Sequence, residues 1–177
     1  MDKRDIVERI LKSIKESKLE KTSITKILSE KHESPGSLYY HFKSKDKMYK
    51  EVLHYSFGEI ENSLEKVKLR KDSIKNLYRL TERLINFFEE RDDILLFMII
   101  YKGSSYIKSK TDSKRFLERF KKELEKEGID EELTDLKLRA FTGGLCEILY
   151  TSIFIHEKYL TEKEILEICE LFWGECK

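Results

Sequence analysis

Apolar residues recur along the chain at intervals of three and four positions, which is the period of an amphipathic α-helix. The first run predicts a helix over about residues 4–18 and consists of Ile6, Ile10, Leu11 and Ile14. In all, the pattern predicts nine helices, over about 4–18, 22–31, 36–42, 44–67, 72–88, 93–107 (broken near 102–105), 116–128, 130–157 and 161–173. Strand-like alternation is not sustained anywhere, so the predicted fold class is all-α.

The predicted helix ends carry residues that suit them. Ser44 and Asp130 can cap the orphan amides at the start of a helix, and Thr161 with Glu164 forms a capping-box pattern. Gly128 can leave a helix in the left-handed conformation. These signals divide the chain into a short head of small helices and a longer helical body, with the boundary placed between residues 47 and 48.

The amino-acid composition agrees with a helical fold and excludes several classes of protein. Of 177 residues, 39% are charged and one is Pro, which favours long amphipathic helices over a sandwich or barrel. No apolar run reaches the roughly 18 residues that a membrane span needs, and the N-terminus has no apolar signal region. The three Cys, at 146, 169 and 176, have no metal-ligand spacing. We therefore expect a soluble, cytoplasmic protein with no metal and no membrane partner.

The formal net charge of +1 conceals an asymmetry. Residues 1–50 contain 13 Lys and Arg against 8 Asp and Glu, whereas the rest of the chain is net acidic. A basic head suggests a polyanionic partner such as nucleic acid, although a basic helix face can also be merely solvated.

Residues 22–47 have the organisation of a helix-turn-helix. Two short helices joined by a tight turn make a poor packing unit, but the second of them can lie in the major groove of DNA. Its first turn is small, with Pro35, Gly36 and Ser37, so its backbone can approach base edges. The amides that open the next helix, beside Lys45, can bind a phosphate.

The segment from Ser34 to Tyr49, SPGSLYYHFKSKDKMY, resembles the recognition-helix signature of the TetR family of transcriptional regulators. The Thr-rich run from Thr22 to Ile27 is similar to the start of that family's second helix. The resemblance covers about residues 4–53. It departs from the family pattern at the turn, where His32 replaces the usual Gly, and at Pro35, which replaces a common Lys.

The resemblance implies a set of DNA contacts in the head. Phosphate contacts are expected at Ser23, Ser34, Tyr39, Tyr40, His41 and Lys45, and the positions nearest base edges are Thr25, Pro35, Gly36 and Ser37. Tyr39 could instead lie in the core, because only one of two adjacent tyrosines must face outward on a helix. Leu38 and Phe42 are expected to be core residues.

The resemblance also implies that residues 48–177 form an effector-binding and dimerisation domain. An inducer pocket is expected among the aromatic residues of the body, with His54, Phe57, Phe88, Phe97 and Tyr101 as candidates; a hydrophobic or aromatic effector would suit them. Each of these aromatics could equally be an ordinary core residue. A dimer interface is expected at Ala140, Gly143, Gly144, Leu145 and Phe172, although the glycines could instead pack within one chain.

Taken together, the sequence predicts a TetR-like regulator, expected to be a repressor, that binds a palindromic double-stranded DNA operator as a homodimer and is released by a small-molecule inducer. No catalytic constellation and no cofactor motif is present, so an enzyme is not expected. The alternative is a helical scaffold that binds a protein partner and has lost specific operator binding.

Overall fold

The computed structural model describes residues 3–16, 41–101 and 115–175, with Lys45 described by its backbone alone. Most of these residues are helical, and no strand occurs among them. The chain divides into two compact units. Unit 1 comprises Met1–Gly58 and Asp92–Ser113, and unit 2 comprises Glu59–Arg91 and Lys114–Lys177.

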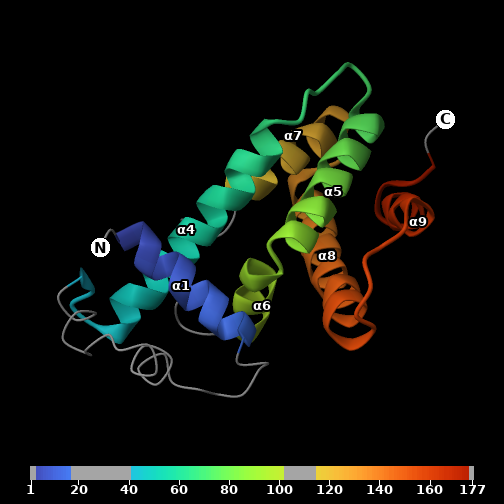
Figure 1. Cartoon of the computed structure of the whole chain (residues 1–177). Helices are drawn as coiled ribbons and strands as arrows, with labels where there is room; N and C mark the ends of the chain where they lie inside the picture. The colour runs from blue at the N-terminus through green and yellow to red at the C-terminus, as the bar shows by residue number, and fades with distance from the viewer. Residues whose placement is uncertain (1–2, 17–40, 102–114, 176–177) are drawn as a thin grey trace. The chain divides into compact units, whose positions relative to one another are not determined.

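Seven of the nine predicted helices fall wholly or largely within the described ranges, and each of the seven is helical there (Figure 1). The α-helices are α1 Lys3–Glu16, α4 Lys45–Glu65, α5 Ser73–Glu90, α6 Asp92–Tyr101, α7 Glu118–Lys126, α8 Glu131–Tyr150 and α9 Glu162–Trp173. A 3-10 turn, η1 Arg115–Leu117, precedes α7, and a π-helical turn, η2 Thr151–Ile155, follows α8. The predicted helices over 22–31 and 36–42 lie outside the described residues, apart from His41 and Phe42.

Unit 1 is built on the packing of α1 against α6. The first part of α4 contacts α1 through side chains, because the Tyr55 hydroxyl of α4 donates to Glu8 of α1. The apolar stripe predicted for α1 is buried, with Ile6, Ile10 and Leu11 fully covered. Helix α6 begins with two acidic residues, where the helix dipole favours negative charge. One of them, Asp92, forms an ion pair with Lys15 of α1 at 2.7 Å, which ties the end of α1 to the start of α6.

Unit 2 consists of the end of α4 and a bundle in which α5 packs against α7, α8 and α9 (Figure 1). Its centre is aromatic. Phe120 of α7 and Phe141 of α8 have ring centroids 5.2 Å apart, and Trp173 of α9 lies 4.7 Å from Phe141. The indole N–H of Trp173 donates to the buried hydroxyl of Thr81 at 2.9 Å, so the polar atom of this large side chain is satisfied.

The predicted helix boundaries are largely confirmed. The Asp130 side chain accepts a hydrogen bond from the Leu133 amide at 2.9 Å, and Thr161 and Glu164 form the reciprocal capping box. Ser44 accepts from the Lys47 amide at the start of α4. Gly128 has a φ of 76°, as expected for a residue that ends a helix in the left-handed conformation.

The end of α8 differs from the sequence prediction. The α-helical bonding predicted to continue to residue 157 changes at Thr151 into a π-helical turn, in which the His156 amide donates to the Thr151 carbonyl at 2.9 Å. The following residues fold back, because the buried Ser152 hydroxyl donates to the Lys158 carbonyl at 3.0 Å. By length and composition alone the segment Glu131–Ile155 could cross a membrane, but core helices of soluble proteins pass the same test, and one such segment is weak evidence of a span.

The predicted functional boundary between residues 47 and 48 does not coincide with the boundary between the two compact units. Unit 1 continues along α4 to Gly58 and takes in α6, because α6 packs on α1. The assignment of DNA binding to residues 1–47 and of effector binding and dimerisation to residues 48–177 therefore stays a prediction about roles.

Candidate nucleic-acid interface

Most of the predicted DNA-contacting residues lie outside the described part of the chain. These are Ser23, Thr25, Ser34, Pro35, Gly36, Ser37, Tyr39 and Tyr40. The remaining two are His41, which is helical and partly exposed, and Lys45, which is the first residue of α4. All ten assignments stay predictions.

The described residues do show how the predicted recognition segment joins unit 1. Phe42 is 3% exposed, which confirms its assignment to the core. The Lys3 ammonium of α1 lies 5.9 Å from the centroid of the Phe42 ring, within cation–π range. Burial of Phe42 fixes the point at which the chain passes from His41 toward α4.

The start of α4 has the features of an anion-binding helix terminus. The first amides of a helix have no partner within the helix and carry the positive end of its dipole. Ser44 satisfies the Lys47 amide at 3.2 Å, and its carbonyl accepts from Met48 at 3.1 Å. Lys43 and Lys47 are exposed beside this terminus, while Asp46 in the first turn offsets part of their charge. The terminus is therefore suited to a phosphate of a nucleic-acid backbone.

The five predicted pocket residues are divided between the two units. In unit 1, the ring centroids of Phe97 and Tyr101 of α6 lie 4.7 Å apart, and the Tyr49 ring of α4 lies tilted against Tyr101 at 4.6 Å. Phe57 is buried in the same unit, whereas His54 is exposed on α4. Phe88 belongs to unit 2, where it packs edge-on against Phe87. Three of the five, Phe57, Phe88 and Phe97, are thus buried core residues, and Tyr101 is half-buried. The role of the five as a pocket stays a prediction.

Two hollows lie in unit 2, and most of the residues that line them are charged or polar. A groove of about 570 Å³ is lined by Leu69, Arg119, Lys122, Glu123, Glu125 and Lys126. A smaller one of about 320 Å³ lies at the π-helical turn and is lined by Glu147, Ile148, Thr151, Ser152, His156, Lys158, Leu160 and Glu164. Neither of these two hollows includes any of the predicted pocket residues.

The five residues predicted for a dimer interface have different environments within one chain. Leu145 is buried, and the Phe172 ring packs edge-on against Phe141 at a centroid distance of 5.3 Å. A Cβ atom at Gly144 would stand 2.8 Å from Cζ of Phe172, so this glycine permits close packing of α9 on α8 within the chain. Ala140 is exposed, and a Cβ at Gly143 would meet nothing within 4 Å.

Comparison with solved structures identifies the fold. A crystal structure described as a TetR-family transcription regulator from Shewanella sp. PV-4 superposes with a TM-score of 0.78, at 17% identity, over 97% of this chain and 96% of the other. The TetR-family regulator PfmR from Thermus thermophilus gives 0.72, at 21% identity, over 97% and 99%. The fold is that of TetR-family transcription regulators. A transcriptional regulator from Streptomyces coelicolor A3(2) is similar at a TM-score of 0.51 and 16% identity, over 81% of this chain and 70% of the other.

The TetR fold is recognised here by structure rather than by overall sequence. No family model matches the chain, and no curated protein matches its sequence. At 16–21% identity the comparisons establish the fold. The short segment from Ser34 to Tyr49, on which the sequence resemblance rests, is consistent with them.

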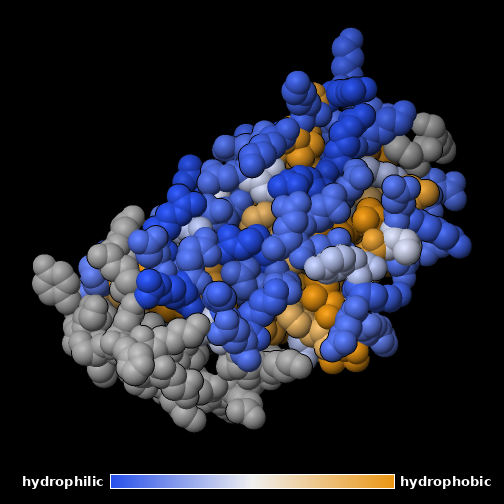
Figure 2. Space-filling model, viewed as in Figure 1, coloured by the Kyte–Doolittle hydropathy of each residue, from blue (hydrophilic) through white to orange (hydrophobic). Residues whose placement is uncertain are grey.

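The sequence interpretation named Ala140 and Gly143 of α8 for a dimer interface but missed the large apolar residues that are exposed on α8 and α9. Large apolar side chains are exposed along α8, its π-helical turn, the connection that follows and α9, namely Leu133, Leu136, Ile155, Tyr159, Leu166 and Leu171. Figure 2 shows hydrophobic side chains reaching the surface over α8 and toward its end, on a face that is otherwise mostly hydrophilic. From the spacing of apolar residues alone, Leu133 and Leu136 look like part of the buried stripe of an amphipathic helix. Their spacing of three and four positions with Ala140 and Gly143, however, places all four residues on one exposed side of α8.

Proposed function

We propose that this protein is a DNA-binding transcriptional repressor that binds a palindromic operator as a homodimer and is released by a small effector molecule. The observation that carries the proposal is the TetR fold over nearly the whole chain, in a protein whose segment before α4 has the recognition-helix pattern. An enzyme is not proposed, because the structures with this fold are described as transcription regulators.

The head is the proposed DNA-binding part. Its predicted contacts are the ten residues from Ser23 to Lys45 named above, with the amides at the start of α4 as a phosphate site. A single two-turn recognition helix contacts few base pairs. Two heads related by a twofold axis would read an inverted repeat, which supports a dimer.

The exposed apolar face of α8 and α9 supports the same assembly. Monomeric soluble proteins seldom leave a continuous apolar patch uncovered. Leu136 and Leu171 are 55% and 74% exposed in the single chain, and a second copy of the chain would cover such a face. We place the dimer contact on this face, with Ala140 and Gly143 in it. A soluble dimer of this kind acts on DNA in the cytoplasm.

The effector is proposed to be hydrophobic or aromatic, in keeping with the aromatic residues of α4, α5 and α6. A ligand releases the protein from DNA only if it binds the released conformation more tightly than the bound one. Thermal-shift screening should then give stabilisation by apolar compounds, and a response to polar metabolites alone would contradict this part of the proposal.

The experiment that tests the function is selection of random DNA duplexes by the purified full-length protein at about physiological salt, with sequencing of the retained pool. Enrichment of one inverted repeat is the expected result. Retention of DNA without an enriched motif would leave non-specific binding by a basic head. No retention would favour the alternative, a helical scaffold for a protein partner.

Substitutions then test the head contacts. Tyr40→Ala and Lys45→Ala should weaken binding to the selected duplex, and Lys45→Ala should also lower the slope of log affinity against log salt by about one. Lys50→Ala is the matched control, because Lys50 is an exposed lysine farther along α4 and outside the predicted contacts. Equal affinities of Lys45→Ala and Lys50→Ala at two salt concentrations would overturn the Lys45 assignment.

A further inference from the structure

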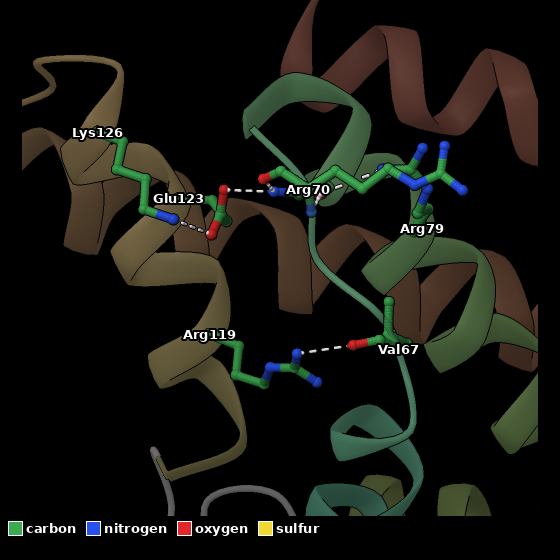
Figure 3. A network of polar contacts seen from close by, with 7 residues as sticks. Val67, Arg70, Arg79, Arg119, Glu123 and Lys126 are labelled. Carbon is green, nitrogen blue, oxygen red and sulfur yellow. Dashed lines mark hydrogen bonds and ion pairs between the residues drawn. The ribbon is translucent and has the colours of Figure 1, made fainter. Parts of the chain in front are cut away.

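The carboxyl end of α4 is held by a side chain from α7. The last carbonyls of a helix have no partner within the helix, and the negative end of its dipole attracts a cation. Helix α4 has no basic residue in its last turn. The Arg119 guanidinium supplies that charge and donates one hydrogen bond to the Leu64 carbonyl. It donates another, of 2.8 Å, to the Val67 carbonyl (Figure 3).

The connection from α4 to α5 is held by a second contact. The side-chain amide of Asn76 pairs with both backbone groups of Arg70, accepting from its N–H and donating to its carbonyl, each at 2.8 Å. The second N–H of this amide donates to Glu123 Oε2 of α7 at 2.9 Å. Asn76 is fully buried, so both donors of its NH₂ group are used without water.

Glu123 is an unusual residue to find in this position. It is 1% exposed, and an ionised carboxylate in such a place is costly unless it is paired and hydrogen-bonded. Lys126 Nζ lies 2.6 Å from its other oxygen and completes the pairing (Figure 3). With one oxygen paired to Lys126, the other oxygen of Glu123 accepts one N–H of Asn76, which leaves the second N–H directed at the Arg70 carbonyl. Glu123 therefore orients Asn76 toward Arg70.

We propose that Arg119 and Glu123 are positioning residues that anchor the carboxyl end of α4 and so determine the half-site spacing that the protein accepts in its operator. The inference rests on the proposed function. The two residues are one helical turn apart on α7 and hold, respectively, the end of α4 and the chain that follows it.

The length of α4 makes the anchor important. With 21 residues, α4 is about 31 Å long, and the predicted recognition segment directly precedes its other end. A tilt of about 5° at the anchored end would move the far end by roughly 3 Å, which is close to the rise of one base pair. A loose anchor would therefore let the heads fit operators whose half-sites are one base pair closer or farther apart.

The test compares three variants of the full-length protein. Arg119→Gln removes the guanidinium from the end of α4, and Glu123→Gln keeps the side-chain size but removes the charge that orients Asn76. Lys122→Gln is the matched control, because it removes one positive charge from the same helix without touching either contact. Circular dichroism and urea unfolding check that each variant folds.

Two measurements are made on each variant. Amide hydrogen exchange over residues 60–70 should be about tenfold or more faster in Arg119→Gln, because charged hydrogen bonds to the end of α4 are lost, and unchanged in Lys122→Gln. Affinities are then measured for the selected inverted repeat and for the same repeat with its spacer shortened or lengthened by one base pair. Wild type and Lys122→Gln should discriminate among the three duplexes, whereas Arg119→Gln and Glu123→Gln should bind a single half-site normally and discriminate less.

Each outcome is decisive. Unchanged exchange in Arg119→Gln would overturn the anchor itself. Faster exchange with unchanged spacing preference would show that the contacts only stabilise the fold and that the positioning role is wrong. If the wild-type protein retains no duplex at all, the proposed function fails, and the exchange data then show whether the anchor exists as a purely structural contact.

Discussion

Gly144 has a local role that can be measured at the scale of one residue. A Cβ atom there would stand 2.8 Å from Cζ of Phe172, so the ring must move if Gly144 becomes Ala. The change gains up to about 1 kcal/mol of helix propensity but disturbs an aromatic contact worth about 0.5–1.5 kcal/mol. We expect Gly144→Ala to give no net stabilisation, or a loss of up to about 1 kcal/mol, in urea unfolding at a fixed protein concentration.

The control for this prediction is Gly58→Ala on α4. A Cβ at Gly58 meets nothing within 4 Å, so the same propensity gain should appear in full, at about 0.5–1 kcal/mol. Equal stabilisation by both substitutions would mean that the Phe172 ring moves aside without cost.

The same residue shows what sequence can and cannot reveal. The small residues of the segment 130–157 predicted that another helix approaches closely, and at Gly144 the Phe172 ring of α9 does so. Small size is compatible with a neighbour from the same chain or from a second chain, and only the structure shows that Phe172 of the same chain fills the space beside Gly144. For Gly143, whose surroundings are open, the dimer interpretation remains a prediction.

At the scale of an element, the start of α9 depends on the ionised form of Glu164. Its pKa is lowered from 4.5 to about 2 because the carboxylate accepts the Thr161 backbone N–H, and also bonds from Lys158 and the Thr161 hydroxyl. A pKa that is lower in the folded state stabilises the protein above pH 4.5, and this contribution is lost as the pH falls toward 2.

We therefore expect Glu164→Gln to be less stable than wild type at pH 7, with a difference that shrinks as the pH is lowered from about 4.5. Urea midpoints measured from pH 7 to pH 3 give the comparison. Glu167→Gln, which removes an exposed ion pair with Lys163 on the same helix, should have a smaller effect at pH 7. A Glu164→Gln difference that stays constant over this range would contradict the prediction.

Elements with strong local signals were predictable, and those decided by packing were not. Capping residues such as Asp130 and Thr161 act on amides within three residues, so their sequence pattern identifies the helix start directly. The π-helical turn after Tyr150 has no comparable local signal. It is stabilised by the return of the chain, where Ser152 binds the Lys158 carbonyl, and by burial of Ser152.

At the scale of the whole molecule, the fold was predictable because one short motif specified it. The recognition-helix pattern and a helical remainder of suitable length sufficed for the TetR resemblance, which the structural comparisons support over nearly the whole chain. The anchor at Arg119 and Glu123 could not be predicted in this way. Its partners Leu64, Val67 and Asn76 are about 50 residues away in sequence, and only the fold brings them together.

Dimerisation through α8 and α9 is the prediction that belongs to the whole molecule. Leu136 is 55% exposed near the middle of the apolar stripe of α8, so a carboxylate there would be buried without a partner in a dimer and would be solvated in a monomer. We expect wild type to have twice the chain mass of 21.2 kDa in analytical ultracentrifugation. The Leu136→Glu variant should sediment as the monomer and lose its preference for the inverted repeat.

The control is Ile100→Glu, at an apolar residue of α6 that is 42% exposed, and this variant should remain dimeric. A dimeric Leu136→Glu protein would place the contact elsewhere. A monomeric wild type would remove the twofold axis on which recognition of a palindrome depends.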